Sequence, residues 1–211
     1  MGKEIFISEV AIRLGGDLTR DEETTMLSQD QVMRIFKDSG ALLNGHFKYT
    51  SGTHGAIYFE KFQVLQYPKY VEMLCAELAR RFNDGDIELV LGPTTGGVLL
   101  AYEIGKQLGT RGIFAEKGTT GRTLKRGFKI NPGERVLVVD DVLTTGGSVW
   151  DTIEVVKENG GVLAGVGLLV DRTGGVIDFG VKTEALISLA VEKYESEECP
   201  LCKQNIPLIE T

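Results

Sequence analysis

Residues 136–148 read V-L-V-V-D-D-V-L-T-T-G-G-S, and this stretch decides the fold. Its first four residues are apolar and largely β-branched, which is typical of a strand buried on both faces. Two carboxylates, Asp140 and Asp141, follow directly, and we expect an acidic, glycine-bearing loop over 140–147. Apolar residues at helical spacing then predict a helix that Gly160 ends. Strand, loop and helix thus follow one another within one short segment.

The same order occurs on either side of this stretch. A strand is expected at 87–91, a glycine loop at 92–97 and a helix at 98–108. A further strand at 162–170 runs into Asp171 and Arg172, and another is expected at 185–191. Alternating strands and helices predict an α/β fold with a mainly parallel sheet. In such sheets ligands bind beyond the carboxyl ends of the strands.

The segments before residue 87 are more varied. Ser28 and Gln31 form a capping box that begins a helix, which Gly40 ends. Residues 41–60 predict short strands and turns, and a longer helix starts at Pro68 and ends near 83–85.

Composition limits the class of ligand. The chain has 211 residues, 42% of them hydrophobic, with 27 Gly and 5 Pro, so extended disorder is not expected. A net charge of −7 disfavours general nucleic-acid binding. No apolar run approaches the length of a membrane span, and we expect a cytoplasmic protein with neither nucleic-acid nor membrane partners. An anionic ligand would need a local group of hydrogen-bond donors to bind it, such as the N–H groups of glycine loops.

The two halves of the 136–148 stretch favour opposite charges. Residues 144–148 can direct N–H groups and hydroxyls at one phosphate, helped by the helix N-terminus. Asp140 and Asp141 would repel that phosphate. The pattern therefore indicates a ligand with a phosphate at one end and hydroxyls, a metal ion or developing positive charge at the other, as in a phosphorylated sugar. The simpler alternative is a strand end followed by a helix cap.

The complete pattern resembles the 5-phosphoribosyl-1-pyrophosphate (PRPP) motif of the type I phosphoribosyltransferases. The resemblance implies a central, mainly parallel sheet flanked by helices, with a small hood formed largely by the N-terminal region. It implies that Asp140 and Asp141 are catalytic and hold the ribose hydroxyls. The residues implied to hold the ribose 5-phosphate are Thr144, Thr145, Gly146, Gly147 and Ser148. Val142 and Leu143 are implied to be substrate-binding as well. The implied cofactor is Mg²⁺, held mainly through PRPP rather than by a protein metal site.

Two further segments resemble parts of the same family. Residues 92–97 resemble its pyrophosphate loop, which implies contacts from Thr94, Thr95 and Gly96. Residues 114–129 contain five basic residues against one acid, as in a mobile loop that closes over PRPP. Lys117, also implied to be catalytic, and Arg126 are its candidates for diphosphate contacts. The alternative for this segment is the solvated turn of a β-hairpin.

The acceptor is indicated by residues 43–52 and 58–60, which resemble the hood of orotate phosphoribosyltransferases. Phe47 and Ser51 would then surround the pyrimidine, Thr144 would contact it, and Arg172 would pair with the orotate carboxylate. Arg172 could instead pair with Asp171. The resemblance covers about residues 28–208 and is to a divergent branch found in thermophiles and other bacteria. It implies a homodimeric pentosyltransferase that converts PRPP and orotate to orotidine 5′-monophosphate and diphosphate in pyrimidine biosynthesis.

Two alternative functions keep the fold. One is a phosphoribosyltransferase for a purine base, which the hood and Arg172 disfavour. The other is a PRPP-sensing regulator that binds nucleic acid without catalysis, which would need an extended basic face that a chain of net charge −7 does not suggest.

Residues 1–25 are mixed and charged with weak periodicity, which predicts an N-terminal arm. We expect a phosphoribosyltransferase domain at 26–211, divided into a hood at about 26–65, a core at about 66–195 and a C-terminal tail at 196–211. In that tail Cys199 and Cys202 form half of a zinc-ribbon pattern, and the sequence indicates no two further ligands nearby. We expect a reduced pair, the alternative being a metal shared across a dimer. His46 and His54 lie in the hood, where they either reach the active site or are hydrogen-bonded turn residues.

Overall fold

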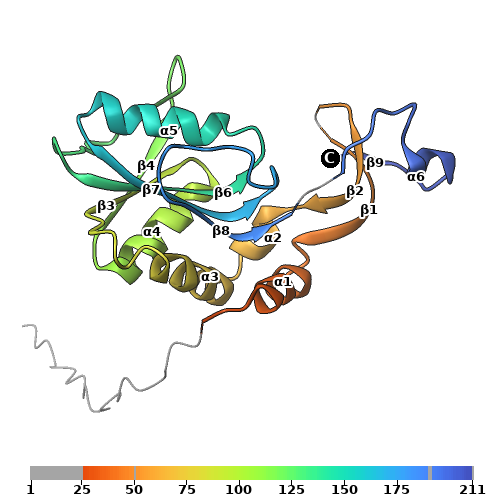
Figure 1. The fold of residues 1–211 in the computed structure, drawn as a ribbon, viewed down its shortest axis with the longest axis horizontal. Coiled ribbons are helices and arrows are strands. Elements are labelled where there is room, and N and C mark those ends of the chain that lie inside the picture. Colours follow the sequence, from red (N-terminus) through yellow and green to blue (C-terminus); the bar gives the residue numbers. More distant parts are fainter. Residues whose placement is uncertain (1–25, 50, 190–191, 211) are drawn as a thin grey trace, which may run out of the picture.

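In the computed structural model, which describes residues 26–49, 51–189 and 192–210, a six-stranded sheet forms the centre of the larger lobe (Figure 1). Its strand order is β5-β4-β3-β6-β7-β8. All neighbouring strands are parallel except β4 and β5, so the predicted mainly parallel sheet is confirmed. The strands are β3 (Leu89–Pro93), β4 (Arg111–Lys117), β5 (Arg122–Thr123), β6 (Arg135–Leu143), β7 (Val162–Asp171) and β8 (Thr183–Ser188). The arm expected at 1–25 lies outside the described residues.

Helices cover both faces of this sheet. In Figure 1, α5 (Gly147–Glu158) lies above it, while α3 (Pro68–Arg80) and α4 (Gly96–Leu108) lie below, with α1 (Gln29–Asp38) beside them. Successive residues of β6 join opposite cores: Leu137 and Val139 pack with α3 and α4, and Val136 and Val138 pack with α5. This explains why residues 136–139 are all apolar, and it confirms that this part of the strand is buried on both faces.

The ends of several elements differ from the sequence prediction. The strand expected to end at Val139 continues to Leu143, because its pairing with β7 extends to Leu143 and Asp171. The last strand of the sheet, β8, covers residues 183–188, and residues 190–191 of the predicted strand lie outside the described part of the chain. The capping box is confirmed: Gln31 N–H donates to Ser28 Oγ at 3.3 Å, and Ser28 N–H donates to Gln31 Oε1 at 2.8 Å.

The hood is built from two distant parts of the chain. Its strands β1 (Leu42–Lys48) and β2 (His54–Phe59) pair antiparallel, and α2 (Lys61–Leu65) leads from them towards the core. The C-terminal segment then returns through α6 (Pro200–Lys203) to add β9 (Ile209–Glu210), parallel to β1. Figure 1 shows α6 and β9 lying against β1 and β2, far from α5. The hood is therefore completed by residues that follow the core in the sequence.

This return brings the cysteine pair to the two hood histidines. The ligand atoms of His46, His54, Cys199 and Cys202 all lie within 4.8 Å of one another. The expectation that the chain supplies no two further ligands near the cysteines is therefore wrong, because the pairing of the C-terminal segment with the hood was not visible in the local sequence.

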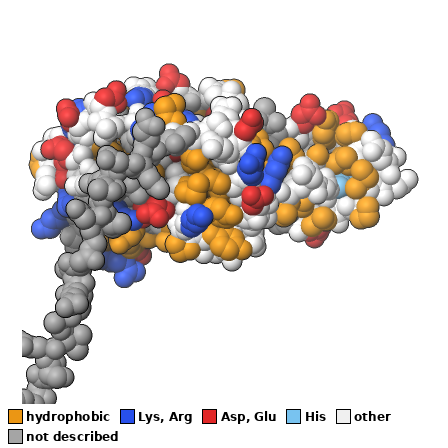
Figure 2. Space-filling model, turned by 90° about the horizontal axis from the view of Figure 1, so that it is seen from below, with side chains coloured by type: hydrophobic (Ala, Val, Ile, Leu, Met, Phe, Trp, Pro, Cys, Tyr) orange, Lys and Arg blue, Asp and Glu red, His pale blue; other side chains and the backbone are white. Residues whose placement is uncertain are grey.

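No helix within the described ranges is both long and apolar enough to cross a membrane. Figure 2 shows one face of the molecule, on which Lys and Arg side chains are interspersed with acidic and apolar ones. The part of this face that is not grey offers no continuous basic surface.

Candidate active site

Three loops meet at one edge of the sheet. Strands β3, β6 and β7 are parallel neighbours, and they end at Pro93, Leu143 and Asp171. Their carboxyl ends therefore carry the loops at 94–96, 144–148 and 172–175 to the same edge. These are three of the segments to which sequence reasoning assigned ligand contacts.

Asp140 and Asp141 lie buried near the end of β6. Asp141 N–H donates to Asp140 Oδ1 at 2.9 Å, while Lys61 Nζ of α2 lies 3.1 Å from Asp141 Oδ1 and 3.0 Å from Asp141 Oδ2. Burial and the negative charge of Asp141 raise the pKa of Asp140 to about 6. Burial also raises the pKa of Asp141, against the opposing effect of the Lys61 ammonium. Sequence reasoning missed Lys61, although it directly follows the hood segment 58–60.

The loop after β6 forms a small hollow of about 120 Å³ at the start of α5. Gly146 is the N-cap residue of this helix and has a φ of 82°, in the left-handed region that a glycine adopts without strain. The hollow is lined by residues from the end of β6, from the loop after it and from the start of α5: Asp140, Val142, Leu143, Thr144, Thr145, Gly146, Gly147, Ser148 and Val149. The predicted phosphate-loop residues thus surround one hollow at a helix N-terminus, where an anion is stabilised.

The loop at 94–96 lies against the acidic pair. A Cβ atom added to Gly96 would stand 1.7 Å from Asp141 Oδ2, so only a glycine fits there. The peptide bond between Thr94 and Thr95 is cis. Gly96 therefore lies directly beside the carboxylate of Asp141.

Arg122 of β5 joins this loop to the phosphate hollow. Its Nη1 donates to Thr94 O and to Thr94 Oγ1, both at 3.3 Å, and its Nη2 donates to Ser148 Oγ at 2.9 Å. Its Nε is buried and has no hydrogen-bond partner within the described residues. Sequence reasoning counted Arg122 among the basic residues of its segment but gave it no contact, because the sequence does not show which basic residue points inwards.

The basic segment at 114–129 forms a β-hairpin over its first half. Strands β4 and β5 pair antiparallel, and Gly118 N–H donates to Gly121 O at 3.0 Å across the turn. Arg126 Nε lies 2.8 Å from Glu116 Oε1. Lys117 lines a separate hollow beside the hairpin, and neither Lys117 nor Arg126 lines the phosphate hollow. In this conformation the segment therefore forms a β-hairpin, which is the alternative named in the sequence analysis.

A larger cleft of about 530 Å³ lies between the hood and the core. The Arg172 guanidinium carbon lies 5.1 Å from the centre of the Tyr49 ring, and Arg172 Nε is buried with no hydrogen-bond partner in the described chain. The lining residues come from the hood, β6, the phosphate loop, the loop after β7 and the C-terminal segment: Tyr49, Ser51, Tyr58, Phe59, Glu60, Lys61, Phe62, Val142, Thr144, Thr145, Arg172 and Lys193.

Two sequence expectations are resolved at this cleft. The Asp171 carboxylate accepts hydrogen bonds from Thr173 N, Thr173 Oγ1 and Gly175 N, so it serves its own loop rather than Arg172. Phe47 is buried behind Tyr58, with the ring centres 5.5 Å apart, and it is not among the lining residues. Phe47 thus supports the wall of the cleft through Tyr58, whereas Ser51 lines it directly.

Comparisons with known proteins agree with this geometry. Residues 63–178 match the family model described as the phosphoribosyl transferase domain. The chain is 51% identical over 183 residues to the orotate phosphoribosyltransferase of Pelotomaculum thermopropionicum, covering 87% of this chain and 96% of that relative.

Solved structures give the same fold. The crystal structure of orotate phosphoribosyltransferase from Aeropyrum pernix is 27% identical, with a TM-score of 0.61, over 75% of this chain and 93% of that one. An adenine phosphoribosyltransferase from Thermoanaerobacter pseudethanolicus is 19% identical, with a TM-score of 0.58, over 73% of this chain and 99% of that one, a likeness of fold alone. Since the family model covers more than half of the chain and a relative is half identical along nearly its whole length, this chain belongs to the orotate phosphoribosyltransferases.

Proposed function

We propose that this protein transfers the 5-phosphoribosyl group of PRPP to orotate, giving orotidine 5′-monophosphate and diphosphate for pyrimidine biosynthesis. In this reaction a ring nitrogen of orotate gives up its proton to water and forms a bond to the anomeric carbon, while the bond from that carbon to the diphosphate oxygen breaks. The diphosphate leaves with the electron pair. The observation that carries the proposal is that the phosphate hollow and the larger cleft share Val142, Thr144 and Thr145 in their linings. The phosphoribosyl donor and the acceptor base would thus bind next to each other, with these three residues in contact with both.

The donor side follows from the charges at the sheet edge. The hollow at 144–148 would bind the 5-phosphate through N–H groups and hydroxyls. Asp140 and Asp141 would accept hydrogen bonds from the ribose hydroxyls and stabilise the positive charge that develops at the anomeric carbon. Lys61 favours the ionised form of Asp141, which that role requires. Arg122, which already contacts both loops, would hold the 5-phosphate and diphosphate sites at a fixed separation.

The acceptor side favours an anionic base. Three cationic side chains line the cleft, Arg172, Lys61 and Lys193, against the single carboxylate of Glu60. The planar guanidinium of Arg172 can donate two hydrogen bonds to one carboxylate. Orotate has a carboxylate that can accept these two hydrogen bonds, whereas adenine and hypoxanthine have none.

We propose that Mg²⁺ is held mainly through PRPP oxygens. The donor set supports this, because the ammonium of Lys61 already pairs with both oxygens of Asp141. When bound, Mg²⁺ neutralises the leaving diphosphate. Lys117 and Arg126 remain our candidates for diphosphate contacts, which they would make after movement of their segment.

We also propose a homodimer located in the cytoplasm, as the family resemblance implies. Light scattering of the purified chain tests the dimer directly.

A panel of acceptor bases tests the function. The protein is incubated with PRPP, Mg²⁺ and one of orotate, uracil, adenine, hypoxanthine or xanthine, and diphosphate release is followed. We expect turnover with orotate alone. Turnover of a purine without orotate would refute the acceptor assignment, and PRPP binding without turnover of any base would favour the regulator.

A further inference from the structure

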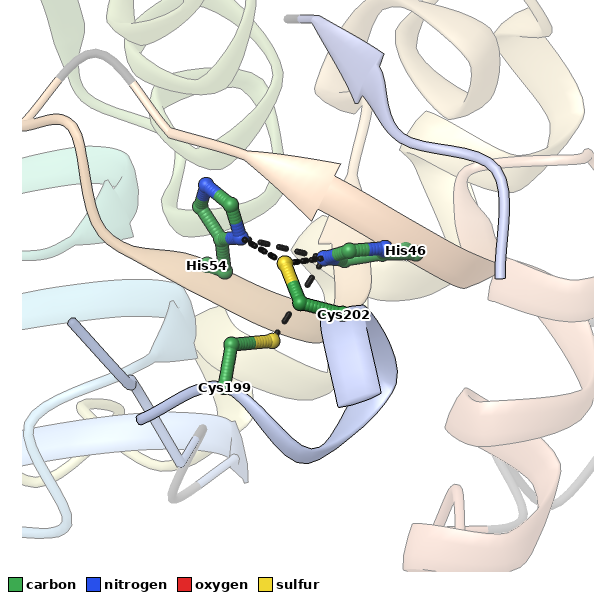
Figure 3. Close-up of side chains that lie close together, drawn as sticks. All are labelled: His46, His54, Cys199 and Cys202. Carbon is green, nitrogen blue, oxygen red and sulfur yellow. Dashed lines mark hydrogen bonds between the residues drawn. The ribbon is translucent and has the colours of Figure 1, made fainter. Parts of the chain in front are cut away.

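The four side chains that meet in the hood have the composition of a metal site. His46 comes from β1 and His54 from β2, while Cys199 is the N-cap residue of α6 and Cys202 lies within that helix. Figure 3 shows the two imidazoles and the two thiols pointing towards one another. His46, His54 and Cys199 are buried, and Cys202 is partly buried. The cluster lies outside the lining of both hollows assigned to the substrates.

The spacing of the four atoms fits tetrahedral zinc. Typical Zn–N and Zn–S lengths place two nitrogens about 3.3 Å apart and a nitrogen and a sulfur about 3.6 Å apart in a regular tetrahedron. His46 Nε2 lies 3.1 Å from His54 Nδ1. The nitrogen to sulfur distances are 3.4 Å from His46 Nε2 to Cys199 Sγ, 3.7 Å from His46 Nε2 to Cys202 Sγ, and 3.3 Å from His54 Nδ1 to Cys202 Sγ. Four of the six distances among these atoms are therefore close to those of a tetrahedral zinc site, and all six lie within 4.8 Å.

The orientation of His46 supports the same conclusion. Its Nδ1 lies 2.8 Å from Ile206 O, and a carbonyl oxygen only accepts, so Nδ1 carries the hydrogen. In the neutral imidazole Nε2 then has a free lone pair, directed at the other three side chains. A ligating histidine commonly donates its other N–H to a backbone carbonyl in this way.

The C-terminal segment has few other means of attachment. Within residues 192–210, all of which the structure describes, Cys199 is the only buried residue. The pairing of β9 with β1 involves two residue pairs, an exposed ion pair joins Lys48 Nζ to Glu210 Oε1 at 3.0 Å, and a bridge between Tyr194 and His54 adds a backbone contact. Apolar burial therefore contributes little to holding this segment on the hood, whereas a metal bound by both parts would hold it strongly.

We propose that His46, His54, Cys199 and Cys202 bind one Zn²⁺ that fixes the C-terminal segment to the β1–β2 hairpin. Two thiolates and two imidazoles suit zinc rather than magnesium or calcium, which prefer oxygen ligands. Two thiolate charges balance those of the ion, so burial of the complete site carries no net charge. With four protein ligands the site is closed, which indicates a structural role.

The metal content of the full-length protein tests this proposal without any activity measurement. Protein is expressed in zinc-containing medium, purified without chelators and measured by elemental analysis, and we expect about one zinc per chain. Co²⁺ exchanged into the site should give the absorption of a tetrahedral ion with thiolate charge-transfer bands. Cys199→Ser combined with Cys202→Ser should lose the zinc. The matched control is Cys75→Ala, which removes a thiol buried in the core and should retain the metal.

Limited proteolysis provides a second readout. Removal of zinc by a chelator should speed cleavage within 192–210 and leave cleavage of the core unchanged. Wild-type protein that neither contains zinc nor takes up an equimolar amount would overturn the proposal, whatever the variants do. Undiminished zinc in the double variant, or a disulfide between Cys199 and Cys202 in freshly purified protein, would overturn it as well.

Discussion

The buried acidic pair has a thermodynamic cost that can be measured. Asp140 has a pKa of about 6 in the folded protein against an ordinary value of 3.8. The folded state therefore binds this proton more tightly than the unfolded state does, and stability falls as the pH rises from about 4 to about 6. Above that range the full cost is present, and a shift of this size corresponds to about 3 kcal/mol.

Replacement of Asp140 by Asn should recover much of this cost. The amide has the same shape, and its oxygen can still accept the hydrogen bond from Asp141 N–H. We expect Asp140→Asn to raise the free energy of unfolding by up to about 3 kcal/mol at pH 7.5, with the gain shrinking towards zero near pH 4. Turnover at pH 7.5 should fall strongly, since the carboxylate is lost.

Urea denaturation of both proteins at several pH values between 4 and 7.5 measures the difference. Asp38→Asn, at an exposed position in α1, is the control and should change stability by less than about 0.5 kcal/mol at every pH. A gain that does not depend on pH would refute the assignment of the cost to an ionised Asp140. So would a loss of stability at pH 7.5.

Three further substitutions probe the site through steady-state kinetics. Arg172→Ala should raise KM for orotate by about 30-fold to 100-fold, because a hydrogen bond to a charged group is lost, and KM for PRPP should change little. Equal effects on both substrates would contradict the role of Arg172. Gly96→Ala would place a methyl group 1.7 Å from Asp141 Oδ2, so kcat/KM for PRPP should fall by at least about tenfold. Activity close to wild type would show that the loop can move to accommodate the methyl group. Arg122→Met should raise KM for PRPP without affecting that for orotate, because it removes the contact with Ser148; an unchanged KM for PRPP would argue against a bridging function.

The central architecture was predictable because its sequence signals are local and strong. The run at 136–139 is apolar at every position, and the capping box at Ser28 specifies a helix start within four residues. The end of β6 was placed too early, since charged residues rarely continue a buried strand and the pairing of Leu143 with Asp171 is a property of the sheet.

The site was predictable only in part. Residues 144–148 act together within one turn, so their shared hollow could be inferred from the sequence. Lys61 reaches Asp141 across 80 positions, and Arg122 reaches Ser148 across 26, so neither contact has a local pattern. The cysteine pair showed half of a motif, whose other half lies about 150 residues earlier in the chain.

The parallel pairing of β9 with β1 also sets an order of assembly. All six strands of the central sheet lie between Lys48 and Ile209 in the sequence, so this pairing closes a very long loop, and such contacts form late in folding. During synthesis all six core strands are made before β9 is. The core, with its phosphate hollow, can therefore fold while the hood still lacks its third strand. The third strand of the hood would then pair with β1 beside a sheet that has already folded.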